Sequence, residues 1–122
     1  MKRKYLLSVV VGAAISLASM ASAAQQDFTL VNHTGLELSA MYVAPESDEN
    51  SWGSDLFEGK VLPDGNEVDI VFSPQNSECD YAINFKDSAG TEWEIRHVDL
   101  CYGTWTKLNL TMQGGKVHWE KQ

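Results

Sequence analysis

The sequence predicts an all-β protein, an antiparallel β-sandwich of about seven short strands with one long loop, and three observations indicate this fold. Apolar residues recur at every second position in several short runs, which is the period of a strand with one buried face. Clusters of Gly, Asn, Asp and Pro separate these runs. No stretch has a sustained helical period, although Ser54 could cap a single helical turn.

The first half of the chain contains three of the expected strands, separated by turns. The strands are expected at 28–31, 36–42 and 68–72, and the turns at 32–35 and 63–66. In the second strand, alternation predicts that the even-numbered residues from Leu36 to Tyr42 face the core and that Met41 faces away. In the third, Val68, Ile70 and Phe72 share the buried face.

The second half contains four more strands, and short hairpin turns join two pairs of them. The strands are expected at 79–86, 92–97, 105–112 and 116–120, with turns at 87–90 and 113–115. The predicted inward residues are Cys79, Tyr81, Ile83, Phe85, Trp93, Ile95, His97, Leu108, Leu110 and Met112. Glu92, Glu94 and Arg96 are expected on the outer face.

The first 23 residues have the order of a secretory signal peptide. Lys2, Arg3 and Lys4 precede an apolar stretch over 5–18, and Ala21-Ser22-Ala23 forms an A-x-A cleavage site. The stretch is too short and too rich in Ser and Gly for a membrane span. We therefore expect cleavage after Ala23 and one domain over 24–122 in the bacterial periplasm or outside the cell. A second hydrophobic run is lacking, so no membrane insertion is expected after cleavage.

Charge limits the classes of partner. Cleavage would remove three of the nine basic residues and none of the seventeen acidic ones, which leaves a net charge near −11. A chain this acidic disfavours binding to nucleic acid or to an anionic membrane surface, since both require clustered Lys and Arg. Cations, basic proteins and neutral sugars remain as partner classes, and the charge also fits a plain role in solubility.

Two cysteines, Cys79 and Cys101, remain in the mature chain. An even pair in an exported protein indicates a disulfide. The alternative, a reactive thiol or a metal-binding pair, would be expected to have a C-x-x-C spacing, which is absent.

Several short motifs along the mature chain resemble those of a widespread group of small, uncharacterised bacterial secreted proteins. They are Asn32-x-Thr34-Gly35, Trp52-Gly53-x-Asp55-Leu56, Leu62-x-x-Gly65, Cys79-Asp80-Tyr81, Asp87-x-x-Gly90 and Asp99-Leu100-Cys101. The resemblance implies a bacterial, periplasmic all-β protein with a Cys79–Cys101 bridge. The group has no established activity, so the resemblance implies none for this chain.

The segment 44–59 lacks strand alternation and is long for a connection in a small domain, and such loops are often functional. Its acids and its tryptophan are the candidate partner-binding residues: Asp48, Glu49, Trp52, Asp55 and Glu58. An acidic loop suits a basic protein or a cell-envelope component, because complementary charge speeds association. We therefore expect a non-enzymatic binding module of unassigned oligomeric state.

A calcium-stabilised or carbohydrate-binding accessory domain is the alternative. Calcium takes six to eight oxygen ligands, and the candidates are Asp48, Asp55, Glu58 and Asp64, with Glu46 and Glu49 nearby. The acids do not have EF-hand spacing, and a solvated loop in which Asp55 accepts bonds from backbone amides explains them equally well. Four tryptophans, at 52, 93, 105 and 119, could stack on sugars, although core packing accounts for most of them.

A hydrolase is the third class considered, and it would depend on His97 with a nearby carboxylate. The sequence has no G-x-S-x-G nucleophile motif and no H-x-x-x-H zinc spacing among His33, His97 and His118. Glu92 and Glu94 could form a glycosidase pair, but they lie on an outward face beside Arg96. We therefore assign no catalytic residue from the sequence.

Overall fold

The computed structural model describes residues 27–71, 78–101 and 105–122. In these ranges the chain forms seven strands: β1 (Phe28–His33), β2 (Leu38–Pro45), β3 (Glu67–Ile70), β4 (Asp80–Asp87), β5 (Glu92–Asp99), β6 (Lys107–Gln113) and β7 (Lys116–Lys121). The predicted signal peptide and Phe72 lie outside the described residues. Within the described ranges, no helix has the length and apolarity needed to cross a membrane.

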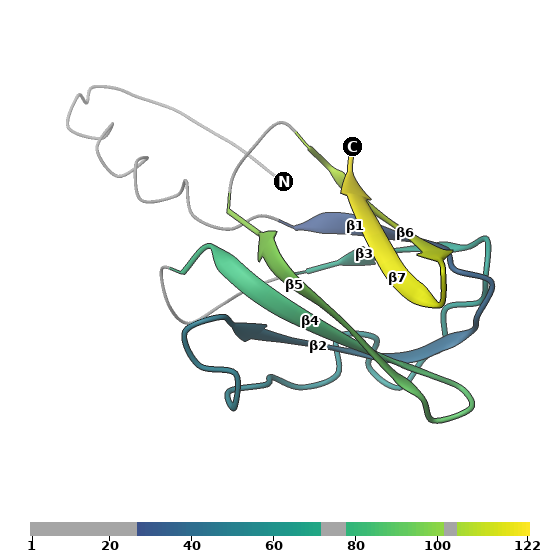
Figure 1. The fold of residues 1–122 in the computed structure, drawn as a ribbon, viewed down its shortest axis with the longest axis horizontal. Helices are drawn as coiled ribbons and strands as arrows, with labels where there is room; N and C mark the ends of the chain where they lie inside the picture. Colours follow the sequence, from purple (N-terminus) through teal and green to yellow (C-terminus); the bar gives the residue numbers. More distant parts are fainter. Residues whose placement is uncertain (1–26, 72–77, 102–104) are drawn as a thin grey trace, which may run out of the picture.

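The strands form two packed sheets, which confirms the predicted β-sandwich (Figure 1). One sheet has four strands in the order β3-β1-β6-β7, and the other has three in the order β2-β4-β5. All pairs are antiparallel except β1 and β6, which run parallel from Thr29 beside Lys107 to His33 beside Thr111. A parallel pair is possible here because the chain between β1 and β6 is long enough for the crossover that parallel strands require.

The core lies between the two sheets and is formed by the inward face of every strand. Leu30, Met41, Ile83, Val98 and Leu108 have no exposed surface. Three of the predicted inward residues, Tyr81, Ile83 and Phe85, are buried in β4, but Ala82 between them is buried as well. The prediction that Cys79 faces the core was wrong, because Cys79 precedes the first paired residue of β4 and is exposed. Met112, expected in the core, is only half-buried near the end of β6.

A bulge at Ser39 breaks the alternation of β2. Leu38 pairs with Asp87 and Ala40 with Lys86, so β2 has one residue more than β4 at this point. The Ser39 hydroxyl donates to the carbonyls of Lys86 and Asp87, at 3.2 Å each. Beyond the bulge the faces exchange, and the prediction for two residues was wrong: Met41 is fully buried, whereas Tyr42 lies on the outer face.

A second bulge interrupts β5. Tyr81 pairs with Val98 and Ile83 with Ile95, so Arg96 and His97 together oppose the single residue Ala82. His97 has a φ of 56°, the left-handed conformation that side chains other than glycine rarely adopt. The prediction that His97 faces the core was wrong, because the bulge turns its side chain to solvent and places Val98 inside.

Candidate functional site

The long segment after β2 does not project from the domain but returns along the exposed edge of that strand. The Gly53 N–H donates to the Val43 carbonyl at 3.2 Å, and the Leu56 N–H to the Met41 carbonyl at 2.8 Å. Further on, Leu62 and Leu38 exchange two backbone hydrogen bonds. The segment therefore covers the backbone of an edge strand, which would otherwise be open to pairing with another chain.

Asp55 anchors this segment. Its carboxylate accepts hydrogen bonds from the backbone N–H groups of Met41, Phe57 and Gly59, at 3.0, 2.9 and 3.0 Å. Burial raises the pKa of Asp55, but these three donors outweigh it and hold the pKa below its usual value. Asp55, rather than Ser54, organises residues 56–59, which form a hydrogen-bonded turn and not a helical turn capped by Ser54.

Other polar residues of the sequence motifs have similar structural roles. The side-chain amide of the fully buried Asn32 donates to the backbone carbonyls of Leu36 and Leu62, and its Oδ1 accepts from the Thr34 N–H. Asp87 accepts from the Trp93 indole at 3.0 Å and from the Thr91 amide at 2.9 Å, and these bonds lower its pKa. In these motifs, the polar side chains of Asn32, Asp55 and Asp87 therefore stabilise turns by accepting hydrogen bonds from the backbone.

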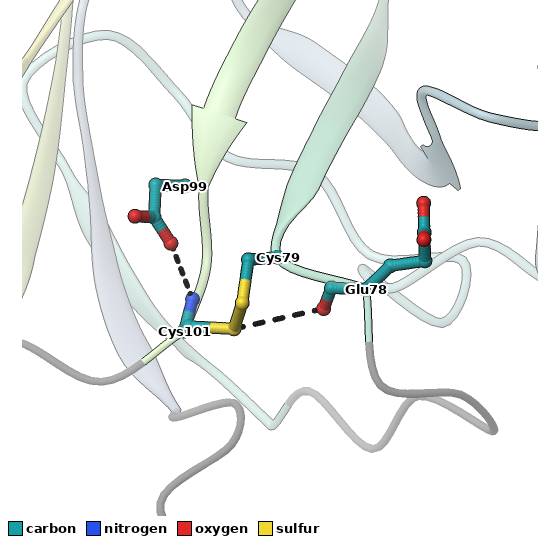
Figure 2. The surroundings of a disulfide bond; sticks show 4 residues. All are labelled: Glu78, Cys79, Asp99 and Cys101. Atoms are coloured by element: carbon teal, nitrogen blue, oxygen red, sulfur yellow. Dashed lines mark hydrogen bonds between the residues drawn. A yellow bond between two sulfur atoms is a disulfide. The ribbon is translucent and has the colours of Figure 1, made fainter.

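The disulfide Cys79–Cys101 is present and ties the start of β4 to the end of β5, with Cα atoms 5.0 Å apart (Figure 2). Asp99 accepts the Cys101 N–H at 2.9 Å, and the Cys101 sulfur lies 3.6 Å from the Glu78 carbonyl oxygen. The bridge thus fixes the end of the three-stranded sheet next to the β5 bulge.

The four calcium candidates are not brought together. Asp55 is occupied by backbone donors, Asp64 accepts the Gly35 N–H at 2.8 Å, and Asp48 accepts the Asn50 N–H at 3.2 Å. Glu58 is exposed at a turn position with a φ of 54°. Over the described ranges, none of these acids belongs to a group of three side chains whose ligand atoms lie within 4.8 Å of one another.

One arginine on β5 gathers carboxylates from the loop and from its own strand. Arg96 pairs with Glu46, with Glu49 at 2.7 Å and with Glu94 at 2.7 Å. Hydrogen bonding and attraction to the guanidinium lower the pKa of Glu49, and the three carboxylates together raise that of Arg96. Three negative charges around a single positive one leave this part of the surface acidic.

His97, next along the strand, contacts two carboxylates. Its ring Nδ1 lies 3.0 Å from Asp80 and 3.7 Å from Glu46, and its backbone N–H donates to Glu46 at 2.7 Å. The hydrogen bond to Asp80, followed by attraction to Glu46, raises the pKa of His97. The imidazole side chain is 72% exposed, so His97 has the carboxylate expected for a hydrolase but stands on an open surface.

An open groove of about 380 Å³ lies on the outer face of the three-stranded sheet, beside the Arg96 cluster. Pairing places Tyr42, Asn84 and Glu94 in one row across the three strands, with Lys86 and Glu92 in the next row. Trp52 and Gly53 of the long segment complete the lining. The Asn84 amide donates to Glu92 at 3.4 Å.

The groove contains only one of the predicted partner-binding residues, Trp52, and Glu49 lies at its neighbouring Arg96 cluster. The sequence predicts a solvated outer face for Glu92 and Glu94. It does not predict that they share a groove with Tyr42, because the bulge that turns Tyr42 to the outer face of β2 leaves no signal in the strand alternation. The other tryptophans are associated with the core: Trp105 is buried with its ring 5.6 Å from that of Phe28, and Trp93 and Trp119 are half-buried against it.

Comparison with known proteins supports the fold and does not extend to the site. No protein-family model and no curated protein matches the chain. A protein from Eubacterium rectale solved by NMR is similar in structure, with a TM-score of 0.54 and 12% sequence identity, over 90% of this chain and 94% of that one. At this identity the likeness shows a shared fold alone.

Proposed function

We propose that the protein is an exported, non-enzymatic binding module that recognises a basic protein or cell-envelope component on the outer face of the β2-β4-β5 sheet. The observation that carries the proposal is the groove in which Trp52 and Tyr42 stand beside Glu92 and Glu94. Aromatic faces and carboxylates together suit a Lys or Arg side chain, which combines cation–π attraction with ion pairing. The disulfide is compatible with a function outside the cytoplasm, as is the signal peptide predicted from the sequence.

The groove is placed where charge would speed an encounter. Glu49 and Glu94 lie at its border with the Arg96 cluster, and the mature chain as a whole is strongly acidic. A positively charged partner would be attracted over a distance of about 8–10 Å at physiological salt. The aromatic side chains would then supply most of the contact area. A function of this kind requires no catalytic residue.

The experiment compares partners captured from a periplasmic extract by the oxidised mature protein and by two groove variants, Trp52→Ala and the double variant Glu92→Gln/Glu94→Gln. Glu120→Gln, on β7 of the other sheet, is the matched control. We expect basic proteins to be captured by the wild type and the control, and to be lost from both groove variants. Equal capture by all four proteins would contradict the proposal.

A carbohydrate ligand is the second candidate, and the same groove favours it. Trp52 and Tyr42 offer aromatic faces, and the Asn84 amide with the Glu92 carboxylate offers hydrogen bonds of the kind that sugar hydroxyls use. Salt separates the two candidates. Binding to a basic protein weakens steeply as salt is added, whereas binding to a neutral glycan on an array stays almost unchanged.

A further inference from the structure

We propose that Glu46, Asp80 and His97 form a binding site for a zinc-type divalent transition-metal ion at the disulfide end of the three-stranded sheet. Each of the three residues offers one ligand atom, a carboxylate oxygen or an imidazole nitrogen, and these atoms all lie within 4.8 Å of one another. The oxygens in contact with His97 Nδ1 are Asp80 Oδ2 and Glu46 Oε2. This site is separate from the proposed recognition groove, because none of the three residues lines that groove.

The distances between donors suit a small ion. With zinc–ligand bonds of about 2.0–2.1 Å in a tetrahedron, neighbouring ligand atoms lie about 3.3–3.4 Å apart. His97 Nδ1 is 3.0 Å from the Asp80 oxygen and 3.7 Å from the Glu46 oxygen, on either side of that value. Small rotations of the exposed Asp80 and His97 side chains would make the two distances equal.

The donor types select the class of metal. An imidazole nitrogen suits zinc and its neighbours in the first transition series, which also accept carboxylate oxygens, whereas calcium takes six to eight oxygen donors. Because the imidazole side chain is 72% exposed, the fourth coordination position faces solvent. Water would occupy it.

The backbone already holds the three residues together. The Glu46 N–H donates to the Asp80 carbonyl at 2.9 Å, and Asp80 follows the disulfide-bonded Cys79 directly. The β5 bulge turns the His97 ring out of the core toward both acids. Arg96 binds the other oxygen of Glu46, which orients that carboxylate as outer-shell groups do in metal sites.

The charges around the site both repel and attract a metal cation. Arg96 repels a cation, but Glu46, Glu49 and Glu94 surround it and leave the neighbourhood negative. A metal ion binds only an unprotonated imidazole nitrogen, so any proton that His97 Nδ1 shares with Asp80 must be released on binding.

Calorimetric titration of the oxidised mature protein with zinc chloride tests the site. The variants are His97→Gly and Asp80→Asn, and the controls are His33→Ala and His118→Ala, which remove the other two histidines. Glycine is chosen at 97 because it adopts a φ of 56° without strain and so leaves the bulge in place. Circular dichroism checks the fold of each variant.

We expect one zinc ion per chain at neutral pH, weaker binding in mildly acidic buffer, and an affinity at least tenfold lower in both site variants. The two control variants and Trp52→Ala should bind zinc as the wild type does, which separates this result from any result on the groove. The proposal is overturned if the wild type shows no saturable binding, if His97→Gly binds as tightly as the wild type, or if His118→Ala removes binding.

Discussion

The two sheets of the sandwich differ in how regularly their strands pair. The sheet with the irregular pairing is the one that carries the groove and the Glu46-Asp80-His97 cluster. Between β6 and β7 the register runs without interruption from Leu108 beside Lys121 to Gln113 beside Lys116. The β2-β4-β5 sheet is interrupted twice, at Ser39 and at Arg96-His97. It also carries the disulfide, the Arg96 cluster and the aromatic groove.

Each bulge re-aims a side chain that strict alternation would bury. The first places Tyr42 in the groove, and the second places His97 beside Asp80 and Glu46. Bulges are common near functional sites for this reason. In this fold the irregular sheet carries both proposed sites, whereas the regular sheet keeps an uninterrupted register. The following experiments test how far the two sheets are energetically distinct.

The disulfide should give the largest effect. It closes a loop of about 23 residues, which corresponds to about 3 kcal/mol in the chain-entropy model. The double variant Cys79→Ser/Cys101→Ser should therefore unfold in urea with a free energy lower by about that amount. Reduction of the wild type with dithiothreitol serves as the matched control and should reproduce the loss. A loss of under about 1 kcal/mol would mean that the irregular sheet does not depend on its covalent link.

Asp55 is next, because three backbone donors rely on one carboxylate. Removing it in Asp55→Ala should lower the free energy of unfolding by about 2 kcal/mol, the scale of lost hydrogen bonds to a charged group. Asp48→Ala, an exposed acid in the same segment, should change it by less than about 0.5 kcal/mol. Equal effects would show that the segment along β2 is held by other contacts.

The same carboxylates predict a loss of stability in acid. The pKa values of Asp55 and Asp87 are depressed in the folded protein, so their contribution is complete above the unfolded value of 3.8 and disappears as the pH falls through the lower folded values. Thermal unfolding measured stepwise below that pH should show the melting temperature falling. Asp55→Asn should show a shallower fall, and an identical slope would contradict this assignment.

The regular sheet has its own sensitive position at the β6–β7 turn. Gly115 has a φ of 79°, and alanine there should cost about 1 kcal/mol because side chains rarely adopt this conformation. Gly53→Ala, in the long segment that runs along β2, is the control. Its added methyl would meet the Val43 carbonyl oxygen at 3.9 Å, an ordinary contact, so little change is expected. The free energy of unfolding of both variants would be measured in urea. A larger loss in Gly53→Ala than in Gly115→Ala would contradict the expectation.

The smallest effect is expected at the exposed end of the Arg96 cluster. Glu49→Gln removes one of three carboxylates from a guanidinium that remains paired with the other two. The melting temperature should fall slightly in dilute buffer and be unchanged in molar sodium chloride, because salt screens exposed pairs. A large decrease that persisted in salt would indicate that Arg96 holds the segment in place.

Much of the fold could be predicted from local sequence because strand alternation and turn residues are local signals. The burial of Tyr81, Ile83 and Phe85 on β4 and the positions of the two hairpin turns followed the prediction. The bulges could not be predicted from local sequence, because the side chains that hydrogen-bond there come from, or reach to, distant parts of the chain. Glu46 accepts the His97 N–H, and Ser39 donates to carbonyls of β4. The acidic composition of the long segment likewise predicted a binding site there. It could not distinguish Asp55, which accepts three backbone hydrogen bonds, from Glu49, which pairs with Arg96 at the surface.

The position of β1 has a consequence for how the chain reaches its fold. β1 is the first strand made, yet it lies in the middle of its sheet, between β3 and β6 (Figure 1). A chain that emerges N-terminus first, from a ribosome or an export channel, therefore cannot complete this sheet until β6 has also emerged. Such long-range pairing is slow, because the chain must close a large loop before any contact rewards it. Completion of this sheet is thus deferred until the chain is almost fully released.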